Sequence, residues 1–261
     1  MAQERNKIHF SAEVLESVQA AAMENAQSLV AESALLSANG FYARAYFLAV
    51  AAIEEVGKGW MSFTARGRDL NAPDVQATLR REFEDHAKKI LLGFSGVVTN
   101  MPPDQLRAEI LEVVNRMIAL KHGREPSMYV DVSSQGNVTS PLKVVRPVNG
   151  VDAPHLARLC LSEALRAFEM RSPPRVSKFQ DRLYTLGKGA LAVANTQDFW
   201  EFLLSRLEAH PKPVTNEKYA ELWAECTVTY HDAYFKRGRT FLQKAVEDAA
   251  EQAEPAGEGV Q

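Results

Sequence analysis

Apolar residues recur along most of this chain at the three- and four-residue spacing that is typical of helices. The clearest segment is residues 41–60, FYARAYFLAVAAIEEVGKGW, where a nearly unbroken apolar run extends from Ala45 to Ile53. A run of this kind predicts a helix that is buried on most of its sides. Charged residues nevertheless lie beside or just after the run: Arg44, Glu54, Glu55 and Lys58.

These charges form a polar stripe on the predicted helix. At about 100° per residue, Glu55 points within roughly 20° of the direction of Arg44, and Lys58 lies about 40° to the other side. Glu54 and Lys58 are four residues apart, in the order that favours an ion pair. Two interpretations follow: an internal ion-pair network that fixes the register of the helix, or a helix that carries acidic residues into a cleft.

Most of the remaining chain also predicts helices. A first helix begins after the capping residue Ser11 and ends at Asn39-Gly40, and its short connection to the helix at 41–60 makes the two an antiparallel hairpin. Segments 128–132 and 142–145 are β-like and predict either a small hairpin or an ordered loop. Further helices are predicted at residues 73–100, 102–123, 152–171, 176–194, 196–210 and 215–253.

These elements predict an all-α protein. The first four helices form a four-helix bundle over residues 11–132, and the later helices form a C-terminal extension, residues 133–253, that packs on it. Residues 254–261 contain proline, two glycines and no apolar cluster, which predicts a disordered acidic tail.

Composition and charge narrow the class of protein. The chain has 261 residues, of which 46% are hydrophobic, so it can bury a core. A formal net charge of -3 argues against a strongly basic nucleic-acid coat protein and leaves room for a local basic cleft. Cys160 and Cys226 lack metal-ligand spacing, and we expect both to be reduced core thiols. The polar N-terminus and the short apolar runs predict a soluble, cytoplasmic protein that does not enter a membrane.

Several common chemistries leave no pattern in the sequence. Neither Gly57-Lys58 nor Gly187-Lys188 belongs to a phosphate-binding loop, and neither begins a dinucleotide-binding motif. The Glu-x-x-His pairs of a di-iron bundle, the metalloprotease HExxH and the serine-hydrolase elbow are also absent from the sequence. We therefore expect no metal and no cofactor.

Two arginines precede a histidine on the predicted helices: Arg81 precedes His86, and Arg116 precedes His122. An imidazole can move a proton at the 2′-hydroxyl or the leaving oxygen of RNA, and a guanidinium can stabilise charge on the phosphoryl group. Such a pair therefore suits RNA cleavage without a metal. Residues five apart on a straight helix point about 140° from each other, however. Spacing alone thus favours a surface arginine and a locally hydrogen-bonded histidine.

Four sequence blocks together resemble a known family. They are Phe41-Tyr-Ala-Arg-Ala45, Ala52-Ile-Glu-Glu-Val-Gly-Lys58, Phe83-Glu-Asp-His-Ala-Lys-Lys89 and Met128-Tyr-Val-Asp131. In this order they resemble the AbiV family of abortive-infection proteins, which have a HEPN-type helical bundle. The resemblance covers residues 11–132 and implies a HEPN-like four-helix bundle in a bacterial, cytoplasmic antiphage protein that forms a homodimer.

The resemblance also implies a site. Many HEPN proteins are RNases whose Arg-x4–6-His motif forms a composite site at the dimer interface, and Arg81 and His86 match that motif. The acidic partner from the preceding helix is then Glu54 or Glu55. The chain departs from the family pattern at Glu82, because many HEPN RNases have a small polar residue after the arginine. The residues implied to bind RNA are Lys58, Lys89 and Arg44, and the reserve catalytic pair is Arg116 and His122.

Two functions follow from these residues as alternatives. The first is an RNA-directed toxin, a metal-independent endoribonuclease that curtails translation in an infected cell. In that function His86 is the general acid or base, Arg81 stabilises the transition state, and Glu55 orients one of them. The second is a non-catalytic HEPN module that acts by binding a phage or ribosomal protein partner. In that function the same charged residues form a buried structural network.

Overall fold

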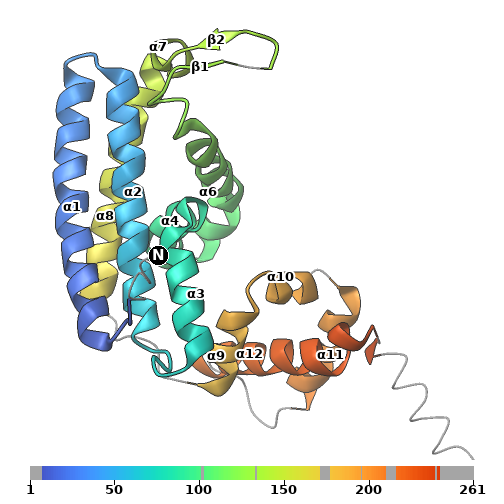
Figure 1. The fold of residues 1–261 in the computed structure, drawn as a ribbon. Coiled ribbons are helices and arrows are strands. Elements are labelled where there is room, and N and C mark those ends of the chain that lie inside the picture. Colours follow the sequence, from blue (N-terminus) through green and yellow to red (C-terminus); the bar gives the residue numbers. More distant parts are fainter. Residues whose placement is uncertain are drawn as a thin grey trace, which may run out of the picture. The chain divides into compact units, whose positions relative to one another are not determined.

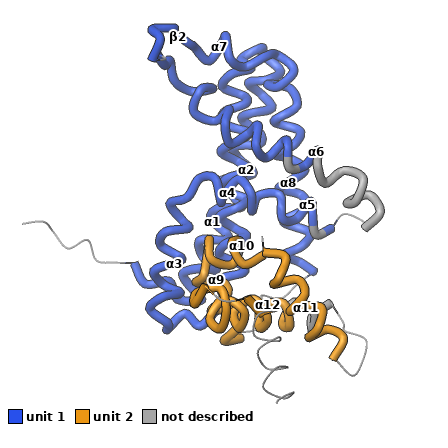
Figure 2. The backbone as a smooth tube through the Cα atoms, turned by 90° about the vertical axis from the view of Figure 1, so that its right-hand side faces the viewer, with its two compact units in different colours: residues 1–175 blue, residues 176–261 orange. Residues whose placement is uncertain are grey.

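The computed structural model describes residues 8–100, 103–132, 134–170, 177–194, 196–209, 216–238 and 240–241. Most of these residues are helical, which confirms the all-α prediction (Figure 1). The chain divides into two compact units, residues 1–175 and residues 176–261 (Figure 2). The acidic tail expected at residues 254–261 lies outside the described residues, as does the end of the last predicted helix.

The first unit contains the long helices α1, α2, α6 and α8. Its elements, in chain order, are α1 (Ala12–Ala38), α2 (Tyr42–Ala65), α3 (Pro73–Glu84), α4 (His86–Gly93), α5 (Ser95–Asn100), α6 (Pro103–Gly123), β1 (Asp131–Val132), β2 (Val138–Thr139), α7 (Pro141–Val144) and α8 (Pro147–Met170). Strands β1 and β2 pair antiparallel in a two-stranded sheet.

Helix α2 lies at the centre of this unit. It packs against α1, α4 and α8, and α1 also contacts α8, so the three long helices share one apolar core (Figure 1). Ala49, Val50 and Ile53 of α2 are fully buried, as the apolar run predicts. Burying one Val or Ile side chain contributes about 1.5–3 kcal/mol. The core therefore fixes the position and the rotation of α2.

Local sequence sets the connection between α1 and α2. The side chain of Ser11 accepts a hydrogen bond from the backbone N–H of Val14 at 3.2 Å and so caps α1. Gly40 has a φ of 79°, in the left-handed region that residues with a Cβ avoid, and the chain reverses there. The predicted antiparallel hairpin of the two helices is confirmed.

The single helix predicted at residues 73–100 is wrong, because the structure has three helices there. Asp85 leaves the helical conformation with a ψ of 100°, and its side chain accepts a hydrogen bond from the N–H of Lys88 at 3.0 Å. Asp85 therefore caps α4. The buried Phe94 separates α4 from α5. Hydrophobic periodicity continues across both breaks, so it does not reveal them.

The β-like segments form a hairpin, but with a different second strand. The sequence predicts a β-like segment at residues 142–145, whereas the structure has the short helix α7 there. Pro141 is at the first position of α7, where a proline favours the start of a helix. The strand that pairs with β1 lies earlier, at Val138–Thr139.

Helix α8 extends the first unit beyond residue 132, the predicted end of the bundle. It packs along α1 and α2, and Ala157 and Cys160 are fully buried in the shared core. It begins at Pro147, earlier than expected, and continues through the buried Pro154. Proline inside a helix removes a hydrogen bond, so packing against the core outweighs this loss.

The second unit is smaller. Its described elements are α9 (Lys178–Leu186), α10 (Lys188–Ala194), α11 (Gln197–Glu208), α12 (Asn216–Ala233) and the 3-10 helix η1 (Phe235–Arg237). Phe199 and Phe202 are buried in an apolar core of its own. The helix predicted at residues 176–194 is interrupted at Gly187, which has a φ of 54°. The last predicted helix is also interrupted, because α12 ends at Ala233 and the 3-10 helix η1 follows.

Two further observations bear on the expected environment of the protein. Within the described ranges, no helix combines the length and the apolar character that crossing a membrane requires. Cys160 and Cys226 are free and buried, as the sequence predicts, and burial raises the pKa of the Cys160 thiol to about 12.

The contact between α2 and α4 is a contact between backbones. A Cβ atom at Gly57 of α2 would lie 1.8 Å from the carbonyl oxygen of Lys89. A Cβ atom at Gly93 of α4 would lie 2.5 Å from the carbonyl oxygen of Ile53. Only glycine fits at these positions, so α4 lies very close to α2. The first residue of α4 is thereby placed beside the middle of α2.

We expect Gly57→Ala to lower the free energy of unfolding by about 1–3 kcal/mol, because the added methyl group collides with backbone that cannot move away. Gly59→Ala is the matched control on the same helix, since its methyl group meets the flexible end of Met23 and alanine is the better helix former. Thermal unfolding followed by circular dichroism checks both variants. Equal melting temperatures would contradict the backbone contact.

Candidate functional site

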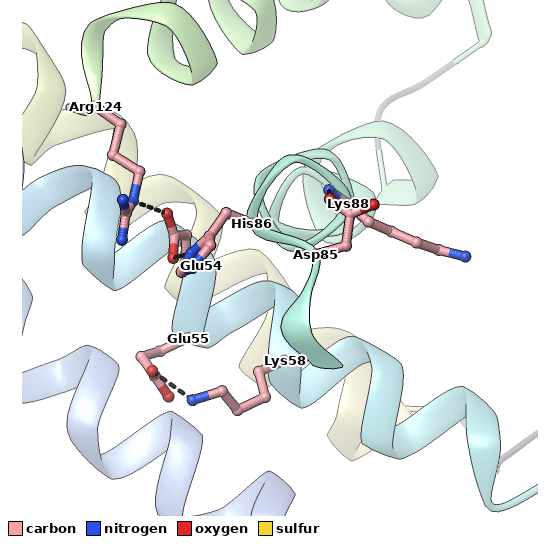
Figure 3. A network of polar contacts seen from close by, with 7 residues as sticks. All are labelled: Glu54, Glu55, Lys58, Asp85, His86, Lys88 and Arg124. Carbon is pink, nitrogen blue, oxygen red and sulfur yellow. Dashed lines mark hydrogen bonds and ion pairs between the residues drawn. The ribbon is translucent and has the colours of Figure 1, made fainter. Parts of the chain in front are cut away.

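Side chains from three separate segments of the first unit meet at Glu54 (Figure 3). Glu54 lies in the middle of α2 and is 6% exposed. Its Oε2 is 2.7 Å from Nδ1 of His86, the first residue of α4. Its Oε1 forms an ion pair with Nε of Arg124, which directly follows α6. The carboxylate therefore bridges an imidazole and a guanidinium, with one oxygen for each.

The position of His86 follows from the elements on either side of it. Asp85 caps α4, so the helix starts at His86. The backbone contact at Gly57 holds α4 against α2. The imidazole is thus brought to Glu54 by main-chain geometry and not by a long flexible side chain.

The Glu54 contact fixes the tautomer of His86. A carboxylate accepts hydrogen bonds, so Nδ1 carries the proton in this contact. In the neutral imidazole, Nε2 is then the nitrogen with the free lone pair. The His86 side chain is 53% exposed, and none of the described residues hydrogen-bonds Nε2. An exposed imidazole that a carboxylate holds in one orientation is the arrangement of a general acid or base.

Arg124 is the member of this cluster that no sequence pattern predicts. The chain approaches α2 closely at Gly123, where a Cβ atom would lie 2.4 Å from the hydroxyl oxygen of Tyr46. The guanidinium carbon of Arg124 is 5.9 Å from the centroid of the Phe47 ring, within the range of a cation–π contact. A buried carboxylate needs a cation, but the sequence has 30 lysines and arginines and nothing in it singles out this one.

The structure separates the two candidate acids of α2. Glu54 contacts His86, whereas Oε1 of Glu55 accepts a hydrogen bond from Nζ of Lys58 at 2.6 Å (Figure 3). Consecutive residues on a helix point about 100° apart, so the two carboxylates face different neighbours. The expectation that Glu55 orients the histidine is therefore corrected in favour of Glu54.

Lys89 lies in the same charged region and is buried. Burial lowers the pKa of its ammonium group, and the charge of nearby Glu54 partly opposes this shift. Lys58 and Arg124 add positive charge that lowers the pKa further. Three cations thus surround the pair of carboxylates on α2.

Arg81 does not join His86. The two residues lie on different helices, on either side of Asp85. The Arg81 side chain is exposed, and its guanidinium donates to the hydroxyl of Thr78 at 3.5 Å. The structure shows no hydrogen bond or ion pair between these two described residues. Glu82 is buried and pairs with Lys88.

The reserve pair lies on α6. Nε of Arg116 contacts Oε1 of Glu112 at 2.8 Å, and both side chains are exposed. His122 is an exposed residue in the last turn of α6. Neither residue of the pair contacts Glu54 among the described residues.

Comparison with protein families identifies the first unit. A HEPN-type family model described as AbiV matches residues 14–160, which is more than half of the chain. The chain belongs to the AbiV family. The matched range contains Glu54, His86 and Arg124, and it agrees with the resemblance of the four sequence blocks. No curated protein and no solved structure matches the chain.

We expect Glu54→Gln to destabilise this AbiV protein by about 2 kcal/mol, because it leaves Arg124 partly buried without a carboxylate. Glu55→Gln is the matched control, since the Glu55–Lys58 pair is closer to solvent and should contribute less than about 1 kcal/mol. Urea unfolding of both variants measures the difference. Equal losses would show that the Glu54 cluster has no special role in stability.

Proposed function

We propose that the protein is an antiphage abortive-infection protein that acts on RNA as a metal-independent endoribonuclease, with His86 as its general acid or base. Membership of the AbiV family supports the abortive-infection role. The observation that carries the chemistry is the 2.7 Å contact between Glu54 and an exposed His86. This contact holds one ring nitrogen and leaves the other free to exchange a proton.

RNA carries its own nucleophile, so one positioned imidazole is sufficient to begin cleavage. Neutral His86 accepts the proton of a 2′-hydroxyl group at Nε2 while the 2′-oxygen attacks the adjacent phosphorus. The bond from phosphorus to the 5′-oxygen breaks, and this oxygen takes a proton from water. The products are a 2′,3′-cyclic phosphate and a 5′-hydroxyl end. Glu54 stabilises the imidazolium that forms during the reaction.

Arg124 supplies the cation of the proposed site. Its guanidinium binds the same carboxylate as His86, so both groups are held in one place. A guanidinium has five N–H donors, and its ion pair with Glu54 is at Nε, which leaves the terminal nitrogens for a phosphoryl oxygen. Arg81 is exposed on α3. In this proposal its role is to contact a second copy of the chain, in the homodimer that the family resemblance implies.

We expect His86→Ala to lower the rate of RNA cleavage at least about 100-fold, because general acid–base catalysis contributes that much or more. Its free energy of unfolding should fall by about 1.5 kcal/mol, because the buried Glu54 loses the hydrogen bond from His86 but keeps its ion pair with Arg124, so the variant stays folded. Bulk RNA from a bacterial host that expresses each variant, with and without phage, measures cleavage. The purified protein with EDTA tests independence from metal. His155→Ala, which removes an exposed histidine of α8, is the matched control and should cleave like the wild type.

Intact RNA in every condition, with phage growth still blocked, would remove the nuclease proposal. Cleavage that yields ends other than a 2′,3′-cyclic phosphate and a 5′-hydroxyl would retain the nuclease and reject this mechanism. Cleavage by the wild type and by His86→Ala at equal rates would move the active site elsewhere.

Lysine substitutions test whether Arg124 or Arg81 supplies the cation of the site. Arg124→Lys keeps the charge but loses the forked donors, so kcat/KM should fall about tenfold. Arg81→Lys should change kcat/KM little, because Arg81 does not contact His86 within one chain. Cleavage assays with purified variants of matched melting temperature make the comparison. The reverse result would assign the cationic role to Arg81, acting from a second copy.

A non-catalytic module that binds a phage or ribosomal protein is the second candidate. The observation that favours it is the burial of Glu54, because its pairing with Arg124 can serve the fold alone. If this alternative holds, the His86→Ala variant protects cells against phage as well as the wild type does. RNA then stays intact in cells that express either protein.

A further inference from the structure

The residues of α2 that reach the surface lead toward a second feature of the first unit, at the N-terminal end of the helix. Every residue on the inner sides of this part of α2 is buried, and those that reach the surface recur every three or four positions. They therefore form one stripe along the helix. Its members are Arg44, Phe47, Leu48, Ala51, Glu55 and Lys58.

The stripe ends in an apolar groove beside the N-terminal end of α2. The groove has a volume of about 840 Å³ and is lined by residues from the start of α2, from the segment 127–130 and from the start of α7. Figure 1 shows where α2 and α7 lie. Phe41 is 54% exposed and Leu142 is 86% exposed at its edge. Large apolar side chains that stay at the surface around a concave site indicate a binding surface.

Arg44 gives the groove its charge. Among the described residues that line the groove, it is the one charged side chain. It is exposed, and the described part of the structure shows neither a hydrogen bond nor an ion pair for it. A guanidinium without a partner beside apolar walls matches a ligand that carries negative charge and flat apolar faces.

Phe47 connects the groove with the His86 site. Its ring lines the groove and also contacts the guanidinium of Arg124. Arg44 lies ten residues before Glu54, which is about 15 Å along the axis of α2 at about 1.5 Å per residue. This distance equals roughly four stacked nucleotides at about 3.4 Å each. A strand with one phosphate at Arg124 therefore reaches the groove with its next few nucleotides.

We propose that this groove binds the nucleotides that flank the cleaved bond of a single-stranded RNA. The bases pack on Phe41 and Phe47, and Arg44 binds a phosphate. This proposal rests on the proposed function, and it adds the substrate class. Aromatic side chains beside a cation are the elements with which proteins hold single strands. Bases in a duplex are stacked and paired, so they are not available to such a groove.

Binding of a fluorescein-labelled 2′-O-methyl RNA of about ten nucleotides to the full-length protein tests the groove. This probe lacks the 2′-hydroxyl nucleophile, so its fluorescence anisotropy reports binding without cleavage. Phe41→Ala and Arg44→Ala should each raise Kd about tenfold. Arg44→Ala should also reduce the slope of log Kd against log salt by about 0.7, which a purely structural effect would not do. Arg158→Ala is the matched control, because it removes an exposed arginine of α8. It should change neither Kd nor the slope of log Kd against log salt.

The outcomes separate this proposal from the nuclease. If Phe41→Ala and Arg44→Ala both keep the wild-type affinity and salt slope, the proposal that the groove binds RNA is wrong, whether or not RNA is cleaved. Loss of phage protection in these variants, with RNA binding and cleavage unchanged, would overturn it and assign the groove to a protein partner. A wild-type protein that neither binds nor cleaves RNA would overturn both proposals. RNA binding that depends on the groove residues, without any cleavage, would support the proposal that the groove binds RNA and would reject the proposal that the protein is a nuclease.

Discussion

A carboxylate that is buried in an apolar helix has to be paired, and this constraint organises the first unit around Glu54. The core shared by α1, α2 and α8 prevents the side chain from turning to water. An unpaired charge there would cost several kcal/mol. His86 and Arg124 remove that cost, each at one carboxylate oxygen. The pairing that stabilises the buried charge also orients an exposed imidazole, so the stability of the unit and its proposed chemistry depend on the same contacts.

The sequence predicts those features that depend on adjacent residues. The apolar run of α2, the cap at Ser11 and the reversal at Gly40 are each decided within a few residues, and the structure agrees with all three. The break at Asp85 is also a local signal, because an aspartate can cap a helix. It is hidden in the sequence since the apolar spacing continues past it.

The candidate site is less predictable because its contacts join distant segments. Whether Glu54 or Glu55 faces α4 depends on the rotation of α2, which the core sets. The spacing of Arg81 and His86 has a simple meaning only on a straight helix, and the chain turns between them. Arg124 follows the end of α6 and is adjacent in sequence to no other residue of the cluster. A single sequence contains no signal that pairs it with Glu54.

The order of these segments along the chain has a consequence for synthesis. Glu54 and His86 are translated well before Arg124, so a nascent chain that ends before α6 cannot assemble the complete cluster. The groups meet only after the ribosome has made α6 and the helix has packed. For a protein that is proposed to attack RNA in its own cell, this order leaves the proposed site without its arginine until α6 has been made and has packed.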